Sequence, residues 1–369
     1  MLYCYYQINQ YNAHFETQFK CCLYLSTFLF YQMRLSVSIH WRRIFMKFFF
    51  LDIHGKGTDF LTNVPNKYQN ILQGKLTNAL ATLSDKSFYC DKFSNVANSI
   101  INNVKFSICD LNSLKAGFKF DSTVQRIFDI FILKLTLILP YKKVMCDSDL
   151  KKYQQVSITL KEYLSFCNIT GNKTRAIEHL RNALNIIARI HVEFSDIHFI
   201  KKNKSESEYY YFRIADGVTR DKSTGTYSIY FNIEFLKYLS KTYIMPFDVR
   251  LFQIKLHKNP NSYKLARRLL LHHNMNLSKV NANIISIKSL IESTNIPTYE
   301  QIKNKGRLKQ LIIEPFERDL NYLQQINFLQ WNYKNEIDYS YNKWIDSSII
   351  FLLSNYPKKD KNNTNVKSI

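Results

Sequence analysis

The most readable pattern of apolar and polar positions begins near residue 120. A strongly apolar run over 124–139 stops at Pro140. Its 16 residues are fewer than the roughly 20 that cross a bilayer, so the run predicts a buried helix. Residues 156–159 then indicate a short extended segment.

Two helices separated by a turn are predicted next. Thr159 and Glu162 stand at capping-box spacing, so a helix should begin at Leu160. Residues 169–172 indicate a turn, and a second helix is expected over 174–189. Its apolar positions share one face, namely Ile177, Leu180, Leu184 and Ile187. The opposite face carries Arg175, Glu178, His179, Asn182 and Arg189.

The pattern changes from helices to strands after this second helix. Residues 190–194 alternate as a strand, and two aromatic strands are predicted over 208–215 and 226–235. The polar link between these two strands carries Arg220 and Lys222. Helix, turn, helix and then a β-hairpin with a basic loop is the element order of a winged helix.

The same order of elements recurs further along the chain, at low residue identity. The expected elements are a helix over 263–273, a short strand over 285–287 and two short helices over 289–292 and 298–301. A long helix over 307–325 and a strand over 328–333 follow. Pro315 lies inside the long helix and should kink or break it at about Glu314. We therefore predict two copies of one plan, over roughly 150–245 and 247–334.

The predicted fold class is α+β, mainly helical, with two tandem winged-helix domains. We expect an aromatic-rich and poorly ordered extension over 1–50 and a polar and weakly structured segment over 51–119. The two winged-helix domains are expected over 120–245 and 246–335, and a C-terminal helix with a Lys/Asn-rich tail over 336–369. Within the second division a helix is expected over 66–83, with one apolar side formed by Ile71, Leu72, Leu76 and Leu80.

The net charge points to a polyanionic partner. The chain has 51 Lys and Arg against 29 Asp and Glu, a formal charge of +22. The excess is concentrated in the two copies, with fourteen basic against five acidic residues over 250–334 and fifteen against nine over 150–245. An A·T-rich genome would also favour Lys codons, so part of the excess has a compositional explanation. Apolar residues make up 46% of the chain, which excludes wholesale disorder.

Cysteine usage and the N-terminal sequence favour the cytoplasm. The seven cysteines follow no disulfide or zinc spacing and are interpreted as free thiols in a reducing compartment. The longest apolar stretch of the N-terminal region, 21–31, is too short to span a membrane, and signal-peptide features are absent. We interpret residues 1–50 as an extension that starts upstream of the folded part. The alternative is a membrane-surface segment, which Trp41, Arg42, Arg43 and the phenylalanines at 45 and 48–50 would support.

A winged helix places its second helix in the major groove and its hairpin loop on the DNA backbone or in the minor groove. Asn172, Lys173 and Thr174 stand at the start of the second helix, where free N–H groups and the helix dipole favour phosphate. The face that would meet base edges carries Arg175, His179, Arg181 and Asn182. In the second copy the corresponding start carries Lys303, Lys305, Arg307, Lys309 and Gln310. Arg267 and Arg268 stand opposite the apolar positions of helix 263–273 and complete the expected contacts.

Each of these residues also has a purely structural interpretation. Charged side chains opposite an apolar stripe are usually only solvated, and aromatics that alternate on a strand, such as those at 209–212, more often pack than stack on bases. Catalytic signatures fail: the sequence has no H-x-H pair, no H-E-x-x-H, no G-x-S-x-G and no Walker A motif. A metal site from His191, Glu193 and His198 is the weaker interpretation of those residues. We therefore predict no catalytic residue, no metal and no cofactor.

The second copy also resembles a known family. The stretches NSYKLARRL at 261–269, ISIKSL at 285–290 and IEPFERDL at 313–320, followed by Trp331, resemble replication initiator proteins of plasmids and related mobile elements. These motifs are packing patterns, and the resemblance covers roughly 120–335. It implies two tandem winged-helix domains that bind repeated origin sequences in double-stranded DNA, help to open the duplex and recruit host replication proteins, with a homodimer as a further state.

Carried onto this sequence, the resemblance implies DNA contacts at Lys173, Arg175, His179, Asn182, Arg220, Lys222, Lys305, Arg307 and Lys309. The expected function is sequence-specific DNA binding as a replication initiator, without catalytic activity. Three alternatives stay open: a winged-helix transcriptional regulator, a metal-dependent nickase or relaxase, and a basic structural protein whose charge reflects codon bias.

Overall fold

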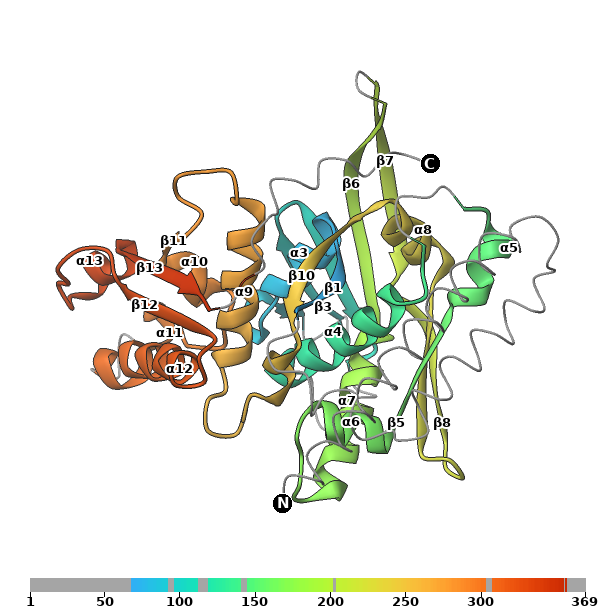
Figure 1. The fold of residues 1–369 in the computed structure, drawn as a ribbon, viewed down its shortest axis with the longest axis horizontal. Coiled ribbons are helices and arrows are strands. Elements are labelled where there is room, and N and C mark those ends of the chain that lie inside the picture. The colour runs from blue at the N-terminus through green and yellow to red at the C-terminus, as the bar shows by residue number, and fades with distance from the viewer. Residues whose placement is uncertain are drawn as a thin grey trace, which may run out of the picture. The chain divides into compact units, whose positions relative to one another are not determined.

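Figure 1 shows the computed structural model of the chain, which describes residues 68–91, 96–111, 119–140, 145–201, 204–302, 307–354 and 356. All of these belong to one compact body, which begins at Val64 and contains the two helix-and-sheet units described below. The predictions for residues 1–50, for Lys303 and Lys305, and for the tail from 357 onward lie outside the described residues.

Residues 68–111 contain more regular structure than expected. They form β1 (Tyr68–Gln73), α3 (Lys75–Thr82), the 3₁₀ turn η2 (Asp85–Ser87), and the strands β2 (Tyr89–Asp91), β3 (Val96–Ile101) and β4 (Val104–Cys109). The predicted helix over 66–83 and the weak structure expected over 51–119 are therefore wrong for this part. Ile71 and Leu72 lie on β1, and the helix begins only after Gly74. A strand and a short helix that follow each other directly give too few turns to reveal either period.

A five-stranded antiparallel sheet has the strand order β2-β3-β4-β6-β7. Its last two strands, β6 (Ile190–Lys201) and β7 (Lys204–Arg213), pair with each other from His191↔Arg213 onward. The prediction that residues 208–215 form a hairpin with 226–235 is therefore wrong. One face of the sheet is buried through Phe106, Ile108, Val192 and Phe194.

The segment after residue 120 forms a helix-and-sheet unit. Its elements are α4 (Ser122–Thr136), α5 (Asp147–Leu150), η4 (Lys151–Tyr153), β5 (Gln155–Thr159), α6 (Leu160–Phe166), α7 (Lys173–Ile187), β8 (Ala215–Asp221), β9 (Thr226–Phe231) and α8 (Ile233–Lys241). The predicted buried helix, the start of α6 at Leu160 and the second helix are confirmed. Three of the strands make a sheet in the order β5-β9-β8, and the β6–β7 pair is inserted between α7 and β8.

A second unit follows β10 (Tyr243–Asp248), which pairs with β1, and the 3₁₀ turn η5 (Val249–Gln253). It comprises α9 (Ser262–Met275), β11 (Ile284–Ser286), α10 (Ile287–Glu292), α11 (Tyr299–Ile302), a π-helical segment η7 (Lys309–Ile313), α12 (Glu314–Gln325), β12 (Leu329–Tyr333), α13 (Tyr341–Asp346) and β13 (Ser348–Leu353). The predicted break near Glu314 is confirmed, because the helix changes from π to α there and Pro315 occupies its first turn.

The two three-stranded sheets have the same arrangement. In β11-β13-β12, as in β5-β9-β8, the last strand along the chain lies between the other two. The boundary predicted at residue 335 is wrong, because β13 pairs with β11 and with β12 and is the centre of this sheet. The fold is α+β, and among the described residues no helix is long and apolar enough to cross a membrane.

Candidate nucleic-acid interface

The start of α7 is an exposed cationic helix terminus. Asn172 caps the helix, and its Oδ1 accepts a hydrogen bond from the Arg175 main-chain N–H at 3.1 Å. Lys173, Thr174 and Arg175 are exposed, so the first turn presents free N–H groups and two positive side chains to solvent. This combination favours a phosphate oxygen at the end of the helix.

The body of α7 is fixed by its apolar side, which packs against α4 and leaves the opposite side open. Its buried positions are Ala176, Leu180, Ala183, Leu184, Ile186 and Ile187. Arg181 is exposed, whereas His179 and Asn182 are half-buried at the edge of the packed side. Burial, reinforced by the Arg175 cation, lowers the pKa of His179, so its imidazole is neutral at pH 7. Glu178 is the single acidic residue of α7.

The β8–β9 hairpin ends in a turn that is ordered by its own polar groups. Asp221 accepts hydrogen bonds from the Ser223 N–H at 2.8 Å and from the Thr224 hydroxyl at 2.8 Å. These bonds lower the pKa of Asp221 to about 2. Gly225 has φ +65°, the left-handed conformation that closes the turn at no steric cost. Arg220 and Lys222 are exposed on either side of Asp221.

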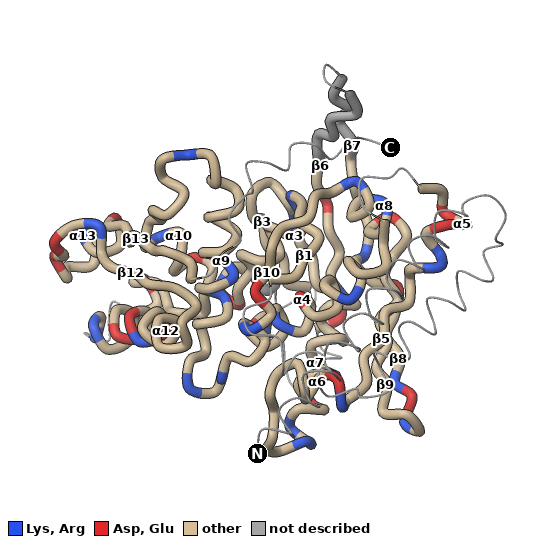
Figure 2. Tube along the Cα trace, in the orientation of Figure 1, with Lys and Arg blue, Asp and Glu red and all other residues tan. Residues whose placement is uncertain are grey.

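This turn is tied directly to the helices. The Leu160 N–H, at the start of α6, donates to the Gly225 carbonyl at 2.9 Å. The predicted capping box is present, since Glu162 N–H donates to the Thr159 hydroxyl at 3.1 Å and the Thr159 N–H donates to the Glu162 carboxylate at 2.7 Å. In Figure 2, Lys and Arg positions lie at the start of α7 and, on either side of an acidic position, at the tip of the hairpin.

In the second unit the predicted basic residues precede the long helix. Arg307, Lys309 and Gln310 are exposed at the start of the π-helical segment. The four residues before Arg307, which include Lys305, are outside the described ranges. The open side of this helix is thus most basic in its first turn.

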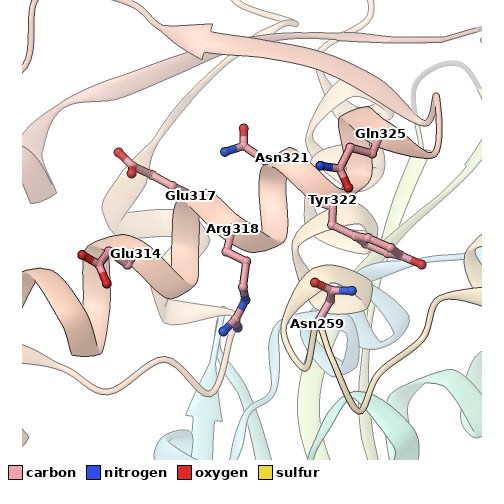
Figure 3. A pocket seen from close by; sticks show the side chains of 7 residues that line it. All are labelled: Asn259, Glu314, Glu317, Arg318, Asn321, Tyr322 and Gln325. Atoms are coloured by element: carbon pink, nitrogen blue, oxygen red, sulfur yellow. The ribbon is translucent and has the colours of Figure 1, made fainter.

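A groove of about 430 Å³ follows α12, lined by Asn259, Glu314, Glu317, Arg318, Asn321, Tyr322 and Gln325. Figure 3 shows Arg318 and Tyr322 extending from the helix toward the loop that carries Asn259. The groove therefore combines a guanidinium, three amides and two carboxylates. Arginine and amide side chains are the groups that read guanine and adenine in the major groove.

The groove is supported by a buried carboxylate. Asp319 accepts hydrogen bonds from the Asn261 main-chain N–H at 2.8 Å and from Arg318 Nε at 2.9 Å. Burial raises the pKa of Asp319, and these donors oppose the rise. Trp331 Nε1 donates to Asn321 Oδ1 at 3.1 Å. The side chains of Arg318 and Asn321 are thus oriented by these hydrogen bonds.

Sequence reasoning missed the groove residues of α12 as candidates. Glu314, Arg318, Asn321 and Gln325 recur at intervals of four, three and four residues, which places them on one helix face. That spacing was readable in the sequence. Only one of these four residues is basic, so net charge did not single out this face.

Two predicted contacts on α9 are structural instead. Arg267 is 1% exposed, and its Nε lies 3.2 Å from Asp129 Oδ2 on α4, so the prediction that it contacts DNA is wrong. Arg268 is largely buried, and its Nη2 donates to the Ser289 hydroxyl at 2.7 Å. Lys264 on the same face is fully buried and donates to the Leu83 and Phe120 carbonyls. The charged side of α9 faces other protein elements and not solvent.

The residues considered for a metal take other partners. On β6, His191 Nε2 accepts from Arg213 Nε at 2.9 Å, and Glu193 pairs with Lys105 at 2.8 Å. The side chain of His198 is not among those described. Within the described part of the chain, no three His, Cys, Asp or Glu side chains are placed to share a metal ion.

No family model and no curated protein matches this sequence. Among solved structures, the chain is similar to the Pi initiator protein in complex with iteron DNA, at 10% identity and a TM-score of 0.34, over 68% of this chain and 96% of that one. It is also similar to domains 2 and 3 of RctB, at 8% identity and a TM-score of 0.38, over 76% and 99% of the two chains. A further structure of RctB domains 2–3 aligns at 9% identity and a TM-score of 0.31, over 70% and 90%.

Proposed function

We propose that this protein binds double-stranded DNA in a sequence-specific manner through two tandem winged-helix units. The observation that carries the proposal is the cationic start of α7 together with a cationic hairpin turn, which the Leu160–Gly225 hydrogen bond holds to the start of the preceding helix, α6. The repeated strand order, β5-β9-β8 and β11-β13-β12, supports a second unit of the same design. Each unit has a helix whose outer side is open to solvent.

In the first unit, α7 would enter the major groove by its N-terminal end. The groove is about 12 Å wide and accepts one helix. Lys173 and the free N–H groups of the first turn would hold a phosphate, while Arg175 and Asn182 would face base edges. Arg220 and Lys222 on the hairpin turn would contact the sugar–phosphate backbone beside that groove.

In the second unit, Arg307 and Lys309 would contact phosphates and the α12 groove would face the bases. Arg318, Asn321 and Gln325 have the donor groups for this role. Glu314 and Glu317 border the same groove and would repel a misplaced phosphate backbone. The negative side chains thus restrict the register of the duplex, as expected for a helix that reads sequence.

We infer further that the protein initiates replication of a plasmid or a related mobile element, and that it works by binding energy without a catalytic step. Two units on one duplex would fix register through phosphates and could stabilise a bent or partly opened A·T-rich segment. The resemblance of 261–269 and 313–320 to initiators supports this role. Repeated origin sequences are then the expected target, and host replication proteins the expected partners.

Selection of bound sequences from a random duplex pool tests the binding proposal. The intact chain should enrich one sequence family, and Arg175→Ala should relax the preference at one position and weaken binding about 5- to 150-fold. Lys279→Ala is the matched control. Lys279 is exposed and lies just after the C-terminal end of α9. It is therefore about 20 Å along this helix from Asn261, the residue that contacts α12. Equal loss on every sequence would show that Arg175 contacts phosphate only.

A second experiment separates an initiator from a transcriptional regulator. The selected sequence is placed as direct repeats beside an A·T-rich stretch on a supercoiled plasmid, and unpaired thymines are detected with permanganate. An initiator makes the A·T-rich stretch reactive when the protein is added. Binding without any reactive thymine would contradict the replication role and leave the DNA-binding role intact.

A further inference from the structure

The five-stranded sheet has an open face with exposed rings that the duplex interface does not use. Tyr209 and Tyr211 on β7 are 65% and 67% exposed, and Tyr89 on β2 is 76% exposed. Ile100 on β3 is 73% exposed. Tyr209 and Tyr211 are two residues apart on β7, so their rings lie side by side on this face.

The strand register places these side chains in two rows across the sheet. The first row runs over four strands through Ile100, Lys105, Glu193 and Tyr211. The second runs over five strands through Tyr89, Asn98, Ser107, His191 and Arg213. Tyr209 lies opposite Ser195, beside the first row. A shallow hollow of about 260 Å³ lies between the rows and is bordered by Lys105, His191 and Tyr211.

The outward tyrosines are not spare core residues. Their neighbours Tyr210 and Phe212 point to the buried face, where Tyr210 stacks on Phe194 at 4.9 Å and packs edge-on against Tyr238 at 5.3 Å. Because successive side chains on a strand point to opposite faces, this packing fixes Tyr209 and Tyr211 on the outside. Their rings lie about 7 Å apart along the strand, a spacing that allows one base on each ring.

The charges around these rings favour a polyanion. Lys105 and Arg213 flank the tyrosines, and the Lys75 ammonium donates to the Ser195 carbonyl at the same edge. Glu193 is the one carboxylate among the described outward side chains of β3, β4, β6 and β7, and Lys105 already pairs with it at 2.8 Å. Burial and the Arg213 cation lower the pKa of His191, so this ring stays neutral and accepts from Arg213 Nε at 2.9 Å.

We propose that this open sheet face, defined by Tyr209, Tyr211, Lys105 and Arg213, binds single-stranded DNA. Unpaired bases stack on the two tyrosine rings, and the backbone phosphates lie against Lys105 and Arg213. Flat rings have no access to bases inside a duplex, whereas stacking on aromatic side chains is the common way to hold a single strand without sequence preference. The site goes beyond the proposed duplex binding and uses different elements.

The test measures binding of a fluorescent oligothymidine to the intact chain by anisotropy. The double variant Tyr209→Ser/Tyr211→Ser should bind it at least about 30-fold more weakly, because it loses two stacked rings. Tyr209→Phe/Tyr211→Phe keeps both rings and should bind like the parent. Both double variants should bind the selected duplex as the parent does, which also reports that they are folded.

Three outcomes would overturn the proposal. The first is that the parent protein does not bind oligothymidine. The second is that the Tyr209→Ser/Tyr211→Ser variant binds oligothymidine as well as the parent does. The third is that the parent is a dimer and the serine variant a monomer in sedimentation velocity, with no specific loss of oligothymidine binding. The face would then be a contact between two copies of the chain. Loss of duplex binding in Arg175→Ala with oligothymidine binding intact would show that the two sites are separate. Tyrosine-dependent oligothymidine binding without any duplex binding would leave this proposal standing and contradict the proposed duplex function.

Discussion

Replacing Asp129 by Asn should destabilise the protein more than replacing an exposed residue such as Arg175. Asp129 is 2% exposed and accepts hydrogen bonds from Arg267 Nε at 3.2 Å and from the Tyr263 hydroxyl at 2.8 Å. The Arg267 guanidinium also lies 5.5 Å from the Phe247 ring centre, and its Nη2 is 3.5 Å from Gln73 Oε1. Asn keeps the shape of Asp129 but removes the negative charge, so the buried Arg267 cation loses its counter-ion.

The expected loss is about 3–5 kcal/mol in the free energy of unfolding, the range for breaking a buried ion pair on one side. The double variant Asp129→Asn/Arg267→Met should recover at least about 1 kcal/mol of this, because it leaves no unpaired charge in the core. Urea unfolding followed by tryptophan fluorescence measures both quantities. A loss below about 1 kcal/mol for Asp129→Asn, or strict additivity in the double variant, would refute the reasoning.

The same variants test whether Arg267 has a structural role and does not contact DNA. Since its side chain is buried against α4, Arg267→Met should leave the dependence of DNA binding on salt concentration unchanged. Arg175→Ala, by contrast, should leave stability within about 0.5 kcal/mol and reduce the log–log salt slope by about 0.9 if Arg175 contacts a phosphate. A reduced slope in Arg267→Met would show that this residue does reach DNA.

Two further predictions concern stability and capping. Burial lowers the pKa of Lys264 to about 7, against an ordinary value of 10.5, so between pH 7 and 10 the unfolded chain binds more protons than the folded one. Lys264 thus makes stability rise with pH in that window, by up to about 1.4 kcal/mol per pH unit, and urea unfolding at pH 7 and 9 should show a smaller rise in Lys264→Met than in the parent. An equal rise in both proteins would contradict the assignment. Asn172→Ala removes the cap of α7 and should cost about 1 kcal/mol and weaken duplex binding, whereas Asn172→Ser should restore both in thermal unfolding and anisotropy. Binding unaffected by Asn172→Ala would mean that the start of α7 does not contact DNA.

Local sequence signals predicted several elements of the first helix-and-sheet unit. The capping box at Thr159 and Glu162 placed the start of α6 correctly, because both partners lie within one turn of each other. The apolar run over 124–139 and the apolar period over 174–189 likewise indicated α4 and α7. Such signals depend on neighbours in sequence and need no knowledge of the rest of the fold.

Pairings between distant segments could not be read in this way. Strand β7 pairs with β6 and not with β9, and β13 completes a sheet whose other strands lie up to about 65 residues earlier. A strand pattern gives the faces of a strand but not its partner. The hairpin and domain boundaries predicted from order alone therefore failed at β7 and at residue 335.

Charge was the least reliable guide to exposure. Lys264 and Arg267 belong to the polar side of α9, yet both are fully buried because α9 lies against α3, α4 and α12. Buried basic side chains are tolerated where carbonyls or a carboxylate accept their hydrogen bonds, as Leu83, Phe120 and Asp129 do here. On α7 the expectation of exposed basic side chains holds for Lys173 and Arg175.

A hydroxyl-radical footprint of the intact chain on its selected duplex tests the central claim most directly. Two winged-helix units on one duplex predict two protected patches, with centres about 10 base pairs or a multiple of that distance apart. Arg307→Ala/Lys309→Ala should erase one patch and Arg175→Ala should weaken the other. One continuous patch that fades uniformly with either variant, or equal protection of random DNA, would contradict the account.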